Sequence, residues 1–330
     1  MNGRELSKSI FCFAFILFLN SSCLLLKQNQ ITEQQPIFQS NFEGSTNVVS
    51  IPETNDYGAK VEMLIGEDNN LENSNWTENL KAFNNRILQV QYTGGDSTKR
   101  YAKVVSEPGN TNNHVLKFWL NDSWSADLGQ QKARVQTNLY GINPGLKEFY
   151  QSVRVYLTED FRVLRNYPEK FTWLTLSEFW NNEWWDSKEK YGFRIGLTIT
   201  KPIKEESDLY FRLNSEDAGQ KEIWEEVNKE FKVPIGKWFT LEYYFKEGND
   251  KTGRFYVAVI PDGEKRQEIF DVKNFTHNTK DPSPNGITGY NPMKLYTSKD
   301  LVAYMKSKDK TLQIYWDDFK LWTNRQPERK

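Results

Sequence analysis

Hydrophobic and polar residues alternate along much of this chain, and the alternation is most regular between Pro234 and Gly263. One run there places Phe239, Leu241, Tyr243 and Phe245 on one face, and a second run does the same with Phe255, Val257 and Val259. This period-two pattern predicts two β-strands. The intervening segment EGNDKTG is rich in turn-forming residues, so the two strands should form a hairpin. A hairpin is marginal in water by itself, and further strands are therefore required.

Other segments show the same signal and supply these strands. They are Ile37–Phe42, Ile87–Tyr92, Val115–Leu120, Arg134–Tyr140, Tyr150–Leu157, Thr172–Trp180, Phe193–Thr200, Leu209–Leu213 and Leu312–Trp322. Residues 45–99 are Asn-rich with a weak pattern, which indicates an excursion with long loops. Ile223–Phe231 suits a helix or a loop, and Leu301–Met305 a short helix. Many short strands with almost no helix predict an all-β, two-sheet antiparallel sandwich or barrel in one domain.

The first residues indicate export and a lipid anchor. Arg4 and Lys8 precede the apolar run Ile10–Leu19, which is too short to span a bilayer and is typical of a secretory signal. Ser21-Ser22-Cys23 then resembles the lipobox of bacterial lipoproteins, in which the cysteine carries the lipid. An ordinary signal peptide with a chance cysteine is the alternative.

We therefore expect a signal peptide at 1–23, a tether at 24–36, a single β domain at 37–322 and a tail at 323–330. The expected location is the outer membrane of a Gram-negative bacterium, with the domain exposed at the surface.

Composition changes this picture little. The net charge of −1 excludes a strongly basic field, so we expect no nucleic-acid partner and no membrane contact beyond the lipid anchor. The chain has 11 Trp and 16 Tyr, which can fill a β core or stack on sugar rings. Both cysteines lie in the first 23 residues, so the domain has no disulfide to form.

The segment Gly236–Gly263, GKWFTLEYYFKEG and GRFYVAVIPDG, resembles the hairpin of concanavalin A-like jelly rolls, in particular polysaccharide lyases of the heparin lyase I and alginate lyase types. The resemblance extends over residues 110–322 and implies a jelly roll that acts on polysaccharide. Arg134-Val135-Gln136 is similar to the Arg-x-Glu strand of those lyases, but no Gln-Ile-His strand is present. Ser177–Glu183 is similar to the Glu-x-Asp-x-x-Glu strand of glycosidases with this fold, without its aspartate.

In such a fold, outward side chains of one sheet line a concave groove. Strand parity places Arg134, Gln136 and Asn138 on one such face and gives Arg194 and Tyr210 the same outward direction. Arginine recognises carboxylates or sulfates, and tyrosine can stack on sugars. These residues therefore predict a groove for an acidic glycan, although outward polar side chains can also be merely solvated.

Elimination from a uronate needs a partner for its carboxylate, a base and an acid. Gln136, Arg194 and Tyr210 are our catalytic candidates on that face. Residues 285–296 look like an ordered connection, from which Tyr290, Lys294 or Tyr296 could contact the ligand or supply a base. The two histidines, His114 and His277, suit a strand and an exposed loop.

Hydrolysis by paired carboxylates is the alternative chemistry, with Glu178 and Glu183 as candidates. Glu178 shares parity with two leucines, so a regular strand would turn it into the core unless a bulge redirects it. Trp180 and Trp184 could form sugar platforms or an edge packing cluster.

Jelly-roll sugar-binding modules commonly share a structural Ca²⁺ between an acid after the first strand and an aspartate in the last. Glu43 and Asp318 occupy those places here and are the predicted metal ligands. A carboxylate that only bonds to nearby backbone is the alternative.

Together these features predict a surface-anchored protein that cleaves or binds an acidic polysaccharide. A non-catalytic glycan-binding lipoprotein is the main rival, and the two missing catalytic signatures favour it. A purely structural envelope protein is the third possibility.

Overall fold

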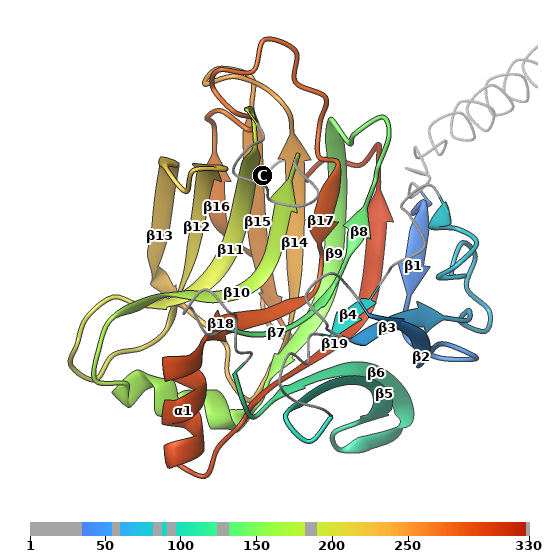
Figure 1. Cartoon of the computed structure of the whole chain (residues 1–330), viewed down its shortest axis with the longest axis vertical. Coiled ribbons are helices and arrows are strands. Elements are labelled where there is room, and N and C mark those ends of the chain that lie inside the picture. Colours follow the sequence, from blue (N-terminus) through green and yellow to red (C-terminus); the bar gives the residue numbers. More distant parts are fainter. Residues whose placement is uncertain are drawn as a thin grey trace, which may run out of the picture. The chain divides into compact units, whose positions relative to one another are not determined.

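Two antiparallel sheets, packed face to face, form the body of the molecule in a computed structural model of the chain (Figure 1). The structure describes residues 35–54, 60–81, 88–90, 97–123, 132–181 and 190–327. The described residues from Pro36 onward belong to one compact unit. No helix in the described ranges is long and apolar enough to cross a membrane.

The first sheet, called sheet A, has eight strands in the described part of the chain, in the order β16-β15-β14-β9-β19-β6-β5, with β1 also paired to β19. Their bounds are β1 Phe38–Ser40, β5 Arg100–Glu107, β6 Asn110–Leu120, β9 Glu148–Leu157, β14 Trp238–Lys246, β15 Arg254–Pro261, β16 Gln267–Val272 and β19 Leu312–Trp322.

The second sheet, called sheet B, has eleven strands among the described residues, in the order β13-β12-β11-β10-β18-β7-β4-β3-β2, and β17 joins β10 to β8. Their bounds are β2 Asn47–Thr54, β3 Lys60–Ile65, β4 Leu88–Val90, β7 Lys132–Thr137, β8 Leu139–Tyr140, β10 Phe171–Trp180, β11 Phe193–Lys201, β12 Tyr210–Asp217, β13 Glu222–Lys232, β17 Gly289–Asn291 and β18 Lys294–Ser298.

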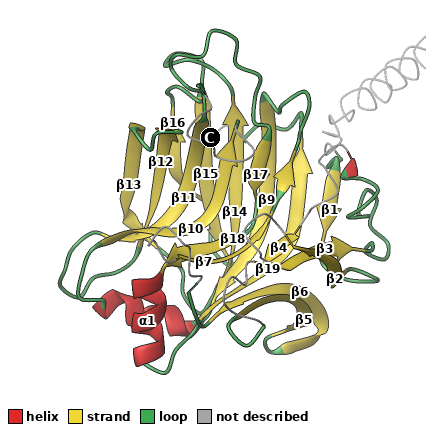
Figure 2. Ribbon diagram, viewed as in Figure 1, coloured by secondary structure: helices red, strands yellow, loops and turns green. Residues whose placement is uncertain are grey.

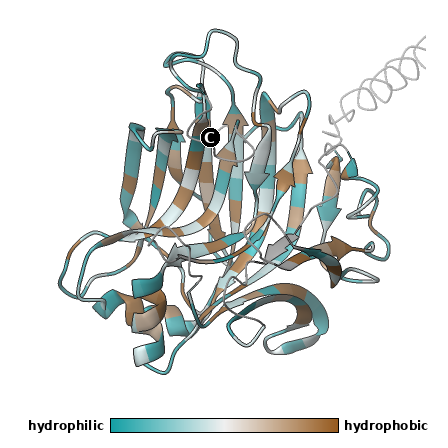
Figure 3. Ribbon diagram, viewed as in Figure 1, coloured by the Kyte–Doolittle hydropathy of each residue, from teal (hydrophilic) through white to brown (hydrophobic). Residues whose placement is uncertain are grey.

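The predicted hairpin lies within sheet A, where β14 pairs with β15 on one side and with β9 on the other. The predicted inward residues of β14, from Phe239 to Phe245, are all buried. The turn is closed by the carbonyl of Asn249, which accepts from the N–H groups of Thr252 and Gly253. Hydrophobic and hydrophilic residues alternate in colour along many of the strands (Figure 3). The prediction of an antiparallel jelly-roll sandwich is confirmed.

The helix α1 and the neighbouring helical segment lie together at one end of the sandwich, and a further short helical segment lies beside β1 (Figure 2). The predicted short helix is α1, Lys299–Ser307, and Ser298 caps it by accepting from the N–H of Leu301. The chain Glu159–Asn166 forms a 3-10 helix. Leu301, Val302 and Met305 of α1 belong to the core cluster.

Two predictions about secondary structure were wrong. Ile223–Phe231 lies in β13, the edge strand of sheet B, rather than in a helix or loop. Charged residues occupy both faces of this strand, as is common at sheet edges. The hydrophobic and polar residues of the strand therefore do not alternate clearly in the sequence. Trp224 anchors it by packing into the core and donating to the carbonyl of Phe275 at 2.8 Å.

Residues 45–99 were expected to be mostly loops with one strand at Ile87–Tyr92, where β4 lies, but β2 and β3 also continue sheet B there. The segment 285–296, predicted as an ordered connection, likewise supplies β17 and β18. β17 and β18 have only three and five residues, so sequence periodicity alone gave a weak signal there.

Candidate functional site

A register shift in β10 decides where Glu178 points. Thr175 pairs with Thr198 and Ser177 with the adjacent Leu197, so β10 contains one extra residue. Before the shift Leu174 faces the core, and after it Phe179 does. Glu178 is thereby directed to the face of sheet B that looks away from sheet A. This is the bulge that the sequence required if Glu178 was to leave the core.

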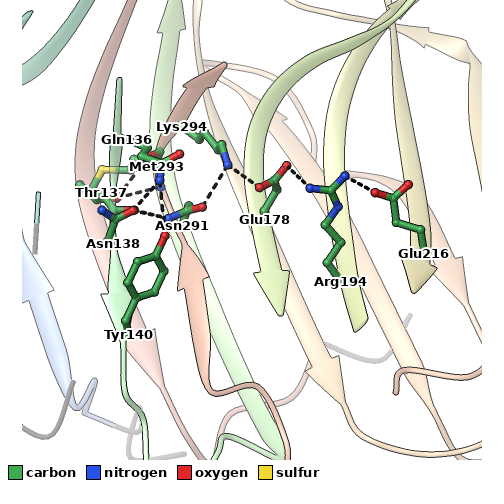
Figure 4. Close-up of polar contacts among 10 residues, drawn as sticks. All are labelled: Gln136, Thr137, Asn138, Tyr140, Glu178, Arg194, Glu216, Asn291, Met293 and Lys294. Carbon is green, nitrogen blue, oxygen red and sulfur yellow. Dashed lines mark hydrogen bonds and ion pairs between the residues drawn. The ribbon is translucent and has the colours of Figure 1, made fainter. Parts of the chain in front are cut away.

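Lys294, at the start of β18, forms an ion pair with Glu178 on this outer face (Figure 4). Its ammonium group also donates to Oδ1 of Asn291 at 3.1 Å. The side chain of Lys294 is 0% exposed and that of Glu178 is 5% exposed. A buried ion pair requires strong compensation for lost hydration, which hydrogen bonds and further charges provide here.

Arg194 on β11 extends the charged cluster. Its Nη1 lies 3.7 Å from Oε1 of Glu178, and its Nη2 bonds to Glu216 on β12. Charges therefore alternate in sign from β18 to β12, as Figure 4 shows. The side chain of Arg194 is 21% exposed, so it is the part of this chain of contacts that is nearest to solvent.

A cluster of amides adjoins Lys294 on its other side. Oδ1 of Asn138 accepts from Nε2 of Gln136 at 2.6 Å and from Nδ2 of Asn291 at 2.7 Å. Asn291 also donates to the backbone carbonyl of Thr137 at 2.8 Å. This network holds Asn291 in the orientation that offers its carbonyl oxygen to Lys294.

Aromatic rings flank the ammonium group. Nζ of Lys294 lies 5.3 Å from the ring centroid of Trp180 and 4.8 Å from that of Tyr296. The guanidinium of Arg134 lies 4.9 Å from the same Tyr296 ring. Cross-strand pairing explains this arrangement, because Lys294 is opposite Gln136 and Tyr296 is opposite Arg134.

The burial and charge of the cluster shift two pKa values. Burial lowers the pKa of Lys294 to about 7, against the attraction of Glu178, and Arg134 and Arg194 lower it further. Burial opposes ionisation of Glu178, but Lys294 and Arg194 outweigh it and hold its pKa below the usual value. These surroundings favour the carboxylate form of Glu178 and weaken the hold of Lys294 on its proton.

The structure therefore brings together Gln136, Arg194 and Glu178 of the predicted catalytic residues, and Arg134, Asn138, Trp180 and Lys294 of the predicted binding residues. Tyr210 begins β12 opposite Thr200, toward the other end of that strand from Glu216. Trp184, Glu183 and Cys23 lie outside the described residues.

The prediction for Tyr290 was wrong. Its ring is buried in the core, where it stacks on Phe179 at 5.6 Å and lies at the same distance from Phe149. Asn291, its neighbour on β17, faces the cluster instead, since successive side chains of a strand point to opposite faces. Sequence reasoning did not single out Asn291 because β17 is three residues long.

The calcium site predicted at Glu43 and Asp318 remains a prediction, and the structure shows the surroundings of the two residues. Glu43 binds the backbone N–H and Nδ1 of His114, and Asp318 is exposed. Asp317 is the buried carboxylate there, and it accepts from Asn113 at 3.0 Å. Burial raises the pKa of Asp317 to about 7, and Asp318 adds to the rise. No group of three or more potential metal ligands gathers anywhere in the described ranges.

The fold and the site thus define an antiparallel jelly roll with a buried, charged cluster on the outer face of one sheet. Among solved structures, the chain is similar to the marine PL-14 alginate lyase from Aplysia kurodai (10% identity, 66% of this chain and 86% of that one, TM-score 0.43). It is also similar to the endo-β-1,4-glucuronan lyase from Trichoderma reesei (12% identity, 68% of this chain and 87% of that one, TM-score 0.42).

A third similar structure is the catalytic domain of a glycoside hydrolase family 131 protein from Coprinopsis cinerea (13% identity, 72% of this chain and 82% of that one, TM-score 0.35). No protein-family model and no curated protein sequence matches the chain.

Proposed function

We propose that this protein cleaves an acidic polysaccharide by β-elimination on the outer face of sheet B. The observation that carries the proposal is the buried Lys294, held between Glu178 and Asn291 and placed over the ring of Tyr296. The tyrosine hydroxyl is a group that can accept and return a proton, and the contact with Lys294 fixes the position of its ring on this face.

The side chains divide into two roles under this proposal. Lys294 has no exposed surface and acts through its neighbour, so it is a positioning residue. Tyr296 is 6% exposed and is the proton acceptor, while the partly exposed Arg134 pairs with the sugar carboxylate. Arg134 would thereby stabilise the charge that develops on that carboxylate when the proton leaves.

The elimination itself balances without a cofactor. The C5–H bond of the uronate breaks as Tyr296 takes the proton, the C4–O4 bond breaks, and a C4=C5 double bond forms. The leaving oxygen then receives a proton, for which the newly protonated Tyr296 is the donor in reach of the same sugar. Arg194 would bind a neighbouring carboxylate along the glycan.

Hydrolysis fits the site less well. A glycosidase needs one carboxyl group with a raised pKa to protonate the leaving oxygen. The pKa of Glu178 is lowered instead, and Glu216 is engaged by Arg194.

Binding without cleavage is the second candidate function. The side chain of Lys294 has no exposed surface, so its charge can serve the structure of the sheet alone. The outer face of sheet B would then bind a glycan without a reaction. In either case the expected partner is a polysaccharide.

A panel of acidic and neutral polysaccharides, followed by absorbance of the unsaturated product and by reducing ends, tests the proposal. We expect product from an acidic glycan, and we expect Tyr296→Phe to lower the rate by about 10²–10⁴-fold while binding is retained. Tyr304→Phe, on α1, is the matched control and should leave the rate unchanged. Binding with no unsaturated product would favour the non-catalytic function, and neither binding nor product would exclude both.

The proposed setting is the cell envelope, with the domain anchored by a lipid on Cys23. This part rests on the apolar run and the Ser-Ser-Cys sequence.

A further inference from the structure

A row of outward side chains crosses five neighbouring strands of sheet A, on the face that looks away from sheet B. Cross-strand pairing places its members directly opposite one another. From β5 to β14 the row consists of Lys103, Lys117, Tyr315, Tyr156 and Trp238. We call these five residues the cross-strand row.

The three aromatic members of the row form a continuous series of rings. Tyr156 lies 6.0 Å from Tyr315 and 5.4 Å from Trp238 between ring centroids. Beside the two lysines, Tyr101 stacks on Trp119 with centroids 5.1 Å apart and ring planes 16° apart. The rings are inclined to one another by 65° and 49°, and the partly exposed Tyr156 and Trp238, on either side of the more buried Tyr315, offer apolar surface with polar edges against which sugar rings can pack.

The two lysines stand opposite each other on β5 and β6. Like charges in this arrangement repel and destabilise the strand pair. Both ammonium groups rest over the Tyr101 ring, Lys103 at 4.8 Å and Lys117 at 5.7 Å, and neither has a salt bridge to another described residue. An anionic group bound between them would remove the repulsion.

We propose that the cross-strand row is a second glycan-binding surface, which takes an acidic oligosaccharide with a carboxylate or sulfate between Lys103 and Lys117. Neighbouring strands lie about 4.8 Å apart, so five strands span roughly 19 Å, which is enough for several sugar rings in line. The row belongs to the sheet opposite the one that carries Glu178 and Lys294, and the proposal does not depend on the cleavage reaction.

A membrane surface fits this row less well than a glycan. Insertion into lipid needs exposed apolar side chains, and the large exposed ones in the described ranges are Ile37 and Ile203, outside the row. Tyr315 at the centre is 9% exposed, so it cannot project into a bilayer. Arg154 near the end of the row stacks on Trp238 but is already paired with Asp262 at 2.6 Å.

The test measures binding of the full chain carrying Tyr296→Phe, so that cleavage does not consume the probe. The probes are alginate, polygalacturonate and heparin oligosaccharides, with neutral laminarin oligosaccharides for comparison. Adding Lys103→Ala with Lys117→Ala should weaken binding of an acidic probe about tenfold or more, because a charge-assisted bond to a ligand is lost. Tyr156→Ala should also weaken it, and high salt should reduce the effect of the lysine changes.

The control is Lys229→Ala with Lys251→Ala, which removes the same charge from exposed positions outside the row. If the row variant and this control bind every acidic probe alike, the second surface does not exist. If the lysine changes affect cosedimentation with phosphatidylglycerol vesicles and no glycan, the row binds lipid and the proposal is wrong.

The same variants separate this inference from the proposed reaction. With Tyr296 restored, Lys103→Ala with Lys117→Ala should still form unsaturated product from a short acidic oligosaccharide. Conversely, absence of any product would leave the binding measurement of the row unaffected.

Discussion

Lys294 combines complete burial with a charged environment. Glu178 and Asn291 satisfy its ammonium group, while Arg134 and Arg194 lie close enough to disfavour its charge. Replacing such a pair by apolar residues is often harmless to a fold, whereas removing one partner leaves an uncompensated charge. The shifted pKa of Lys294 in this pair makes stability depend on pH.

The pH dependence has a definite sign. Burial lowers the pKa of Lys294 from 10.5 to about 7, so between these values the unfolded chain binds more protons than the folded one. Stability should therefore rise with pH from about 7 to 10, by up to ~1.4 kcal/mol per unit for one proton. Denaturant unfolding at several pH values would show this rise in the wild type.

Lys294→Met is the matched variant and should lack that component of the rise. Equal slopes for the two proteins across this range would show that Lys294 keeps an ordinary pKa. The range avoids Asp317, whose raised pKa of about 7 affects stability at lower pH.

At the scale of elements, the site depends on an interruption in sheet B. β17 and β18 are separated by two residues, and they pair with β8 and β7 respectively. Thr137, at the end of β7, bridges the gap, because its Oγ1 donates to the carbonyl of Met293 at 3.1 Å and lies 3.2 Å from the Met293 nitrogen. This contact fixes the backbone immediately before Lys294.

Thr137→Val keeps the shape of the side chain and removes its hydroxyl. We expect it to lower the free energy of unfolding by about 1–3 kcal/mol, since buried polar groups of Met293 lose a partner. Thr137→Ser keeps the hydroxyl and should retain this hydrogen bonding. Chemical denaturation of the three proteins decides the point, and a valine variant as stable as wild type would show that the contact is dispensable.

At the scale of the whole molecule, the sandwich presents two different outer faces. The face of sheet B carries the buried charged cluster, and that of sheet A carries the cross-strand row. A polysaccharide-processing protein with two such faces could hold a long chain while another segment reacts. Tethering to a membrane would keep both faces near the cell surface.

The tether can be tested independently of the domain. Expressed with its signal in a host that processes lipoproteins, the protein should fractionate with membranes. Cys23→Ala should release it or leave the signal uncleaved, whereas Cys12→Ala, within the apolar run, should change nothing. Identical fractionation of the Cys23 variant and wild type would rule out the lipid anchor.

The sequence by itself determined the class of fold and most of its strands. Alternation in Trp238–Lys246 and Arg254–Pro261 predicts a hairpin because one face of each strand is buried, and burial acts on residues that are near in sequence. The same parity placed Arg134 and Gln136 on an outward face of β7. The edge strand β13 escaped prediction because little of it is buried.

Only the tertiary structure decided the composition of the site. Glu178 reaches Lys294 because a bulge in β10 reverses its face and because β18 inserts beside β10, 116 residues further along the chain. Strand pairing over such separations leaves no local pattern in the sequence. For the same reason Tyr290 and Asn291, adjacent in the chain, could not be assigned to core and site until β17 was placed between β10 and β8.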